Sequence, residues 1–316
     1  MNLFVTLAAF AAAAVAAPLE SRSVSPACPE RPLLFHSHND YTRDTPVYEA
    51  FRHNVHSFES DLWFNEDTKA LLVAHTPFTL DDSKTFETQT LNRVLSILAG
   101  NHSHYGKHDA EKFVEHAKDH ATSSPDWYHF YRYGFGGVRP LQLFVEVKTS
   151  NGDKAWPHVM KKLEGLRKKD LLTKVVDGKV HFRPVIVVGT GGTPLDQIAG
   201  GDERYAFFDC PLGGLDSPGE ANGHKFKWSP LICPIASKGF LDVHKPYVGL
   251  LPANDDVRAD FKKIIDQAHC YNTTARIYGQ PTVPKDARYR DFNMEVELGI
   301  DWLNLDDMSD AQRYGN

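Results

Sequence analysis

The sequence predicts an α/β fold of the (β/α)8 barrel (TIM barrel) class, and three observations lead to this prediction. Short, continuously apolar runs recur along the chain from Pro32 onward. Polar stretches with helical character separate these runs, which is the pattern of parallel strands covered by helices. Eight such runs can be counted, and a closed barrel of eight strands explains that number better than an open sheet.

The expected strands begin with three runs in the first quarter of the chain, LLFHSHND, SFESDLW and ALLVAHT. LQLFVEVK and RPVIVVGTGG follow, and YAFFDCP, ARIYGQP and GIDWLNLDD complete the set. Helical patterns lie between them over residues 45–54, 91–99, 156–167 and 255–269. The middle of the count stays open, because residues 229–237 can also form a strand and would then displace residues 205–210.

Residues 32–316 are expected to form a single domain after an extended leader at residues 18–31. Residues 101–139 form a long insertion between strands 3 and 4, which we interpret as a partly helical lid. This insertion is rich in histidine: His102, His104, His108, His116, His120 and His129. A metal site there is the alternative, but the spacings repeat no ligand pattern, which favours solvated histidines.

Residues 1–17, MNLFVTLAAFAAAAVAA, are typical of a secretory signal peptide, because an apolar run ends in small residues. The run is too short and too rich in alanine for a good membrane span, and no other stretch is long enough. We therefore expect a secreted, extracellular protein. The sequons at Asn101 and Asn272 are compatible with a secreted glycoprotein.

Four cysteines follow the signal peptide: Cys28, Cys210, Cys233 and Cys270. In an oxidising compartment they are expected to form disulfide bonds. Their scatter shows no zinc-type spacing, so a structural role is favoured over a metal site. The four residues can pair in three ways, and the sequence leaves the pairing open.

The overall composition excludes one class of partner. The chain has 316 residues, of which 41% are hydrophobic and 24% charged, as in a soluble globular protein with a large core. Its formal net charge is -6, without long runs of like charge. Binding to a nucleic-acid backbone needs a concentrated basic surface, so we expect no nucleic-acid partner.

Ionisable side chains spaced two residues apart end several of the expected strands. The pairs are His36 and His38, Glu59 and Asp61, and Glu146 and Lys148. Residues i and i+2 of a strand face the same side, so each pair should project together. Charges inside a barrel are costly unless they are paired or bound to metal, and active sites lie at the carboxyl ends of barrel strands. We therefore expect these pairs to converge at one site.

Three of these side chains suit a divalent cation. Glu59, Asp61 and Glu146 supply only oxygen ligands, which favour Mg2+, with Ca2+ as the alternative, over zinc. His38 and His75 each close a strand and have the chemistry for general acid and base catalysis on a phosphodiester. Lys148 offers a positive charge to phosphoryl oxygens. Phosphoryl chemistry uses every member of this set.

Six motifs in this order resemble the phospholipase-C-like phosphodiesterases, which include glycerophosphodiester phosphodiesterases and sphingomyelinase D enzymes. They are HSHNDY, SFESDLW, LLVAH, FVEVKT, FFDCPL and GIDWLNLDDM, and they are most similar to the fungal altered inheritance of mitochondria protein 6 branch. The resemblance implies a glycerophosphodiester or phospholipid-like substrate, a role in lipid metabolism and transient contact with a membrane surface.

Position by position, the resemblance makes His38 and His75 the acid/base pair and Glu59, Asp61 and Glu146 the metal ligands. It also implies substrate contacts or supporting roles at the barrel rim for Lys148, His36, Asn39, Asp40, Trp302 and Asn304. The substrate's own hydroxyl can attack phosphorus in the wider superfamily. Hydrolysis and cyclic-phosphate formation are therefore both open here.

Two rival interpretations remain. An amidohydrolase-type barrel would use the His36-Ser-His38 pair and Lys148, but the runs RPVIVVGTGG and YAFFDCP end without the histidines that it needs. A secreted barrel protein without catalysis, binding a phosphate-containing ligand, is the second alternative. The intact set of acid, base and cation residues favours an enzyme. The substrate head group, the cation and the oligomeric state stay open.

Overall fold

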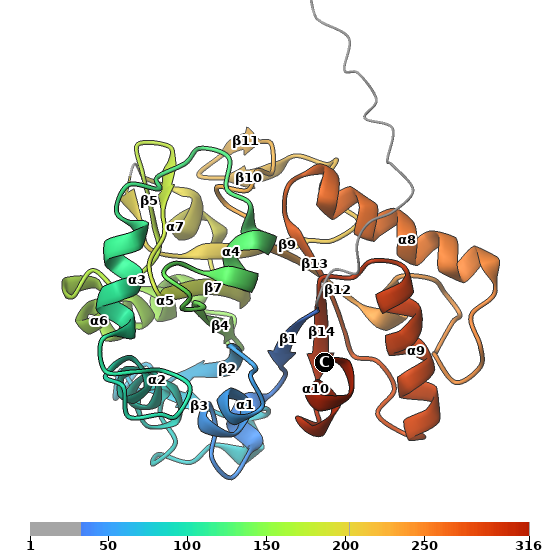
Figure 1. The fold of residues 1–316 in the computed structure, drawn as a ribbon, viewed down its shortest axis with the longest axis horizontal. Coiled ribbons are helices and arrows are strands. Elements are labelled where there is room, and N and C mark those ends of the chain that lie inside the picture. The colour runs from blue at the N-terminus through green and yellow to red at the C-terminus, as the bar shows by residue number, and fades with distance from the viewer. Residues whose placement is uncertain (1–32, 202, 316) are drawn as a thin grey trace, which may run out of the picture. The chain divides into compact units, whose positions relative to one another are not determined.

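A computed structural model describes residues 33–201 and 203–315 of the chain, so the expected signal peptide, the leader and Cys28 lie outside the described residues. Eight parallel strands close into a barrel with flanking helices, which confirms the predicted (β/α)8 fold (Figure 1). In ring order from the first strand they are β1 (Leu34–Ser37), β2 (Ser57–Phe64), β4 (Leu141–Val147), β7 (Val185–Gly191), β9 (Phe207–Pro211), β12 (Ile235–Gly239), β13 (Thr274–Tyr278) and β14 (Trp302–Leu305). Strand β1 pairs with both β2 and β14 and so closes the ring.

One expected barrel strand has a different place. The run ALLVAHT forms β3 (Leu71–Val73), which pairs antiparallel with β2 and is the return arm of a hairpin. The connection over residues 65–70 is too short for the crossover that a parallel neighbour requires. The eighth barrel strand is instead β12, which begins in the stretch 229–237 that the sequence left open. The run YAFFDCP keeps its place as β9.

Helices follow most of the barrel strands. They are α1 (Tyr48–Arg52) after β1; η3 (Glu87–Leu91) and α2 (Asn92–Leu98) after β3; α5 (Gly152–Lys162) and α6 (Glu164–Lys168) after β4; α7 (Leu195–Ala199) after β7; α8 (Asp255–Cys270) after β12; α9 (Lys285–Glu297) after β13; and α10 (Ser309–Tyr314) after β14. Helix α8 shows why such segments cover the barrel. The Asn254 side chain caps it by accepting a hydrogen bond from the backbone N–H of Val257, and Val257, Phe261 and Ile265 bury one face.

Smaller elements decorate this framework. Single helical turns are η1 (Asp40–Thr42), η2 (Pro77–Thr79) and η4 (Phe240–Asp242). Strands β5 (Lys174–Val176), β6 (Lys179–His181) and β8 (Glu203–Arg204) form a small antiparallel sheet, and β10 (Gly219–Ala221) pairs with β11 (His224–Phe226) as a hairpin. A disulfide bond joins Cys210 of β9 to Cys233, just before β12, and so ties two neighbouring barrel strands across that hairpin. Cys270 is exposed and has no disulfide partner among residues 33–201 and 203–315.

The insertion at residues 101–139 lies between β3 and β4 and contains α3 (Asp109–Ala117) and α4 (Trp127–Tyr133). Helix α4 packs against the amino-terminal end of the barrel: the Tyr131 ring lies 4.8 Å from the Trp302 ring, and the Tyr131 hydroxyl donates to Gln142 Oε1. Trp302 and Gln142 stand at the starts of their strands. The insertion therefore closes the end of the barrel opposite to the carboxyl ends of the strands, and α4 is not the lid that the sequence suggested.

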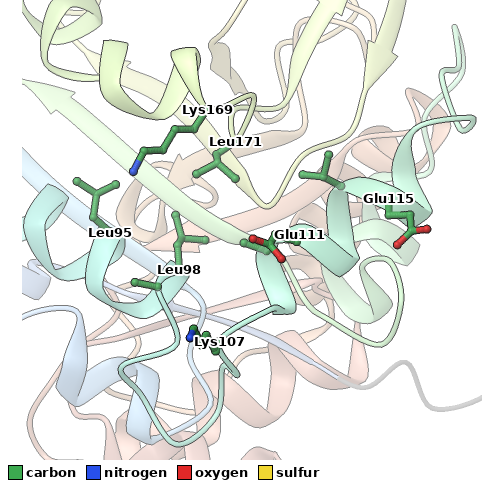
Figure 2. Close-up of a pocket in the computed structure, with 10 residues that line it drawn as sticks. Leu95, Leu98, Lys107, Glu111, Glu115, Lys169 and Leu171 are labelled. Atoms are coloured by element: carbon green, nitrogen blue, oxygen red, sulfur yellow. The ribbon is translucent and has the colours of Figure 1, made fainter.

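A cavity of about 550 Å³ lies between α2, α3 and the segment that follows α6 (Figure 2). Leu98 and Leu171 contribute apolar wall, and Lys107, Glu111 and Lys169 contribute charged side chains. Within residues 33–201 and 203–315, the insertion histidines join no group of three potential metal ligands. No helix among these residues has both the length and the apolar character needed to cross a membrane.

The segment between β12 and α8 is tied to α9 by a buried carboxyl group. Tyr247 donates its hydroxyl hydrogen to Asp291 Oδ1 at 2.6 Å, and Arg290 donates to the backbone carbonyl of Leu250 at 2.9 Å. Burial raises the pKa of Asp291 to about 6, although the hydrogen bond from Tyr247 acts in the opposite direction. Asp291 is therefore protonated more readily in the folded chain than in the unfolded chain.

This raised pKa predicts a pH-dependent stability. The contribution of Asp291 to the free energy of unfolding is fully present below the ordinary aspartate pKa of 3.8. It is lost as the pH rises through about 6, because the unfolded chain releases this proton at a lower pH than the folded chain does. We expect Asp291→Asn to narrow the difference in Tm between about pH 4 and about pH 7 by roughly 2 to 5 °C. Thermal unfolding followed by circular dichroism measures this. Exposed Asp82 provides the matched control as Asp82→Asn, and an unaltered pH dependence in Asp291→Asn would contradict the assignment.

Candidate active site

Three carboxylates meet at the carboxyl ends of neighbouring barrel strands. Glu59 and Asp61 come from β2 and Glu146 from β4, and the parallel register places Asp61 directly beside Glu146. One oxygen from each of the three side chains lies within 4.8 Å of the other two. The two-residue spacing in β2 turns both of its carboxylates inward, as the sequence predicted. The three carboxylates can therefore bind a metal ion.

The environment of these carboxylates fits a bound cation. Glu59 and Asp61 are only 4% and 1% exposed, and Asp61 Oδ1 is buried without a hydrogen-bond partner in the described part of the chain. Burial raises the pKa of Asp61, and the Glu59 carboxylate raises it further. An unpaired buried carboxylate oxygen is costly, and a divalent cation would compensate both that oxygen and the clustered negative charge. The all-oxygen donor set is the one that hard cations prefer.

Lys148 places a positively charged side chain beside two of these carboxylates. Its Nζ lies 3.1 Å from Asp61 Oδ2 and 3.1 Å from Glu146 Oε1. Burial alone would lower the pKa of Lys148, but the carboxylates of Asp61 and Glu146 outweigh it and raise the pKa. The ammonium group therefore stays charged beside two of the candidate ligands, and its side chain remains partly exposed at the mouth.

His38 lies on one side of the carboxylates, between two acidic groups. Its Nδ1 is 2.7 Å from Asp306 Oδ1, and its Nε2 is 3.7 Å from Glu59 Oε2. Burial lowers the pKa of His38, but the hydrogen bond with Asp306 and the charge of Glu59 outweigh it and raise the pKa. A carboxylate that holds one ring nitrogen also fixes the tautomer and orientation of the ring. Asp306 was not predicted from the sequence as a site residue, although it follows Asn304 by two residues in the run GIDWLNLDD and so shares its inward face.

His75 reaches the site by another route. It follows the short strand β3, so the β2–β3 hairpin folds it back beside Asp61, with Nδ1 3.6 Å from Asp61 Oδ2. The side chain is 58% exposed, so it stands at the mouth of the site. The structure therefore brings both predicted histidines to the carboxylate cluster, although they arrive from different kinds of element.

Tyr41 joins these groups and was also missed. Its hydroxyl lies 2.7 Å from Asp61 Oδ2, to which it donates, and 3.3 Å from His75 Nδ1. Burial raises the pKa of Tyr41, and the Asp61 carboxylate raises it further, so the phenol stays protonated and remains a donor. The motif HSHNDY contained this residue, but strand periodicity could not place it, because it lies in the turn after β1.

Asn39 belongs to the same turn and lies at the site, as predicted. Its backbone has a positive φ of 48°, a conformation that asparagine tolerates better than most residues. This conformation turns the Asn39 N–H toward Glu59, where it donates to Oε2 at 2.7 Å. The neighbouring Asp40 points away from the site and accepts hydrogen bonds from Ser37 and from the Val47 backbone, so it supports the turn.

Three other expected substrate-binding residues lie deeper in the barrel. His36 is fully buried with Nδ1 2.7 Å from Ser57 Oγ, and burial holds its pKa well below the ordinary range, followed in effect by the charge of Arg276. Asn304 accepts a hydrogen bond from Arg276 at 2.7 Å. The Trp302 indole donates to Thr274 at the amino-terminal end of the barrel, where it packs against α4. The structure does not bring these three side chains to the mouth.

Two charged residues inside the barrel were not among the candidates. Arg276 is buried, and its Nη2 is 3.9 Å from Glu59 Oε1 while its guanidinium lies over the Phe144 ring. Burial raises the pKa of Asp209 to about 6, against the effect of Arg276, and Thr190 donates to its Oδ2 at 3.1 Å. Both could have been recognised in the sequence as charged residues at inward-facing positions of otherwise apolar strands.

Comparison with known proteins adds an independent observation. The family model described as the AIM6-like phosphodiesterase domain matches residues 29–209, which include the three carboxylates, both histidines and Lys148. A protein of Arthroderma benhamiae called "Altered inheritance of mitochondria protein 6 homolog" is 29% identical over 90% of this chain and 84% of its own length. Proteins called "Altered inheritance of mitochondria protein 6" are 26% identical in Kluyveromyces lactis, over 88% of this chain and 71% of that protein, and 27% identical in Saccharomyces cerevisiae, over 88% and 69%.

Proposed function

The chain belongs to the AIM6-like phosphodiesterase domain family, and on this premise we propose that it is a metal-dependent phosphoric diester hydrolase or lyase. One observation carries the proposal: the three clustered carboxylates, Glu59, Asp61 and Glu146, have a histidine on each side. A hard-cation site flanked by two groups for proton transfer can supply both the charge stabilisation and the acid/base catalysis that speed cleavage of a phosphodiester.

The carboxylates would hold a divalent cation, with Mg2+ favoured and Ca2+ as the alternative. When bound, such a cation stabilises the charge that develops on the phosphoryl oxygens. Lys148 keeps its charge beside Asp61 and Glu146 and adds a second positive group on the phosphate side of the site. The buried guanidinium of Arg276 offsets part of the negative charge of Glu59 from inside the barrel.

The two histidines would carry the protons. One histidine accepts the proton of the attacking water or substrate hydroxyl while the new P–O bond forms, and the other donates a proton to the leaving alcohol oxygen as its P–O bond breaks. Asp306 fixes the ring of His38 for this transfer, and Tyr41 contacts both Asp61 and His75. Attack by a substrate hydroxyl gives a cyclic phosphate, and attack by water gives a phosphomonoester.

The substrate proposed for this site is a glycerophosphodiester or a phospholipid-like diester. We propose no nucleic-acid substrate.

We also propose that the protein is secreted. The disulfide bond between Cys210 and Cys233 is compatible with an oxidising compartment, and the sequon residues Asn101 and Asn272 are both exposed.

Metal removal followed by product analysis tests the proposal. We expect a chelator-treated chain to be inactive and added Mg2+ to restore turnover, because the clustered carboxylates need the cation's charge. Phosphorus NMR of reactions with glycerophosphocholine, lysophosphatidylcholine and sphingomyelin reports the substrate and distinguishes a phosphomonoester from a cyclic phosphate. Calorimetric metal binding without turnover of any of these diesters would contradict the enzyme and favour a phosphate-binding barrel.

A further inference from the structure

Most of the exposed large apolar side chains of the described residues lie on segments that follow the carboxyl ends of β3, β12 and β13. In residues 33–201 and 203–315, nine large hydrophobic side chains are exposed, and eight of them lie on three segments that follow β3, β12 and β13. We name these segments the 76–84 loop, the 240–254 loop and the 278–285 loop. The ninth, Tyr133, ends α4 in the insertion that packs on the opposite end of the barrel.

The 76–84 loop borders one side of the mouth. It follows His75, whose Nδ1 is 3.6 Å from Asp61, and it carries Phe78 and Leu80. Phe78 is 95% exposed, so almost its entire ring faces solvent. The loop therefore presents apolar surface directly next to a proposed catalytic group.

The other two loops border the opposite side. The 240–254 loop follows β12, and the 278–285 loop begins at the end of β13 with Tyr278, whose ring is 5.2 Å from the Arg276 guanidinium inside the barrel. Strand β12 stands four places from β2 in the ring of eight, and therefore across the barrel from it. The 76–84 loop thus begins beside the carboxylates, and the other two loops follow strands on the opposite side of the barrel.

The 240–254 loop holds its apolar side chains outward by anchoring its backbone. The carbonyl of Leu250 accepts a hydrogen bond from Arg290, and the carbonyl of Leu251 accepts one from Tyr247 at 3.2 Å. The Leu251 side chain is nevertheless 75% exposed. Because its backbone is already held in place, the loop loses little conformational entropy when a binding partner covers the leucines, and this favours association.

The charges of the three loops indicate what kind of surface covers them. They contain three acidic and three basic side chains, Asp81, Asp82, Asp242, Lys84, Lys245 and Lys285, and so have no formal net charge. Binding to anionic membranes relies on clustered Lys and Arg, which these loops lack. A neutral apolar rim is complementary to a zwitterionic lipid surface instead.

We propose that the three loops dock the chain on a zwitterionic phospholipid surface, with the mouth of the site facing the lipid. This inference rests on the proposed phosphodiesterase function, because it makes the substrate a diester presented by that surface. A protein bound to all three loops would block the entrance to the site. A lipid surface can contact the same loops and still let a single lipid molecule enter the barrel.

Vesicle binding by an inactive full-length chain tests the proposal without consuming lipid. We expect the chain carrying Glu59→Gln to sediment with sucrose-loaded phosphatidylcholine vesicles. Phe78→Ser and Leu251→Ser, on opposite rims, should each lower the partition coefficient roughly tenfold and together roughly 100-fold, because each removes a large apolar side chain from the lipid. Tyr133→Ser is the matched control and should leave partitioning unchanged. Thermal unfolding confirms that each variant is folded.

Several results would overturn the proposal. They are the absence of binding to phosphatidylcholine, an equal loss in Tyr133→Ser, and binding that requires phosphatidylserine or disappears in high salt. Concentration-dependent dimerisation abolished by Leu251→Ser, without vesicle binding, would assign the rim to a second copy of the chain. These readouts do not depend on catalysis. Failure of the unmodified chain to cleave soluble glycerophosphocholine or any other diester would refute the proposed function instead.

Discussion

Glu59→Gln is expected to lower metal-dependent turnover of a soluble phosphodiester by on the order of 10^3-fold while the chain stays folded. Glutamine keeps the shape of the side chain and can still accept the hydrogen bond from the Asn39 backbone. It removes one of three charges that would hold the cation. Steady-state kinetics at saturating Mg2+ measures the loss in turnover, and calorimetry measures the accompanying loss in metal affinity.

The hairpin next to the site offers a matched control. Glu66 lies in the turn between β2 and β3, and its exposed side chain accepts hydrogen bonds from Asn151 and Lys154 at the surface. Glu66→Gln should therefore leave turnover and Mg2+ affinity nearly unchanged, because exposed ion pairs contribute little. Unchanged turnover in Glu59→Gln would remove the carboxylate cluster from the mechanism.

His38→Ala is expected to lower turnover by about 10^2- to 10^4-fold, as is usual when a general acid or base is removed. The ring lies between Asp306 and Glu59, so its loss removes the proton carrier on one side of the carboxylates. Added imidazole should restore part of the rate in this variant, because a small base can enter the vacated space. A purely structural histidine would show no such rescue.

The exposed histidine His108, on the insertion, provides the control for this substitution. His108→Ala should have the activity of the unmodified chain. We expect His75→Ala to resemble His38→Ala, since the two rings flank the same carboxylates. Near-normal rates in both His38→Ala and His75→Ala would show that the acid/base assignment is wrong.

The lower half of the barrel explains why some polar side chains near the site have a structural role. A hydrogen-bonded chain runs from Tyr131 of α4 through Gln142 and Ser57 to His36. Each group in this chain is buried, and buried polar groups need such partners. The insertion therefore supports the interior of the barrel beneath the carboxylates, because Tyr131 supplies a hydrogen-bond partner for the buried Gln142 side chain. The neutral His36 belongs to the same buried network.

The sequence by itself determined the fold class and the acidic part of the site. Alternation along a strand decides which side chains share a face, so Glu59 with Asp61, and Glu146 with Lys148, could be assigned to one interior before any contact was known. The cost of unpaired charge inside a barrel then indicated that they converge, and Asp61 and Glu146 are neighbours in register. These predictions needed only local periodicity and elementary electrostatics.

Only the tertiary structure decided the rest. An apolar run has the same pattern in an antiparallel return strand as in a parallel barrel strand, so the sequence could not distinguish β3 from β12. His75, Tyr41 and Asp306 reach the site through a hairpin, a turn and a strand end, where side-chain direction follows from chain path and not from periodicity. The position of the insertion beneath the barrel likewise depended on long-range packing of Tyr131 on Trp302, which no local pattern encodes.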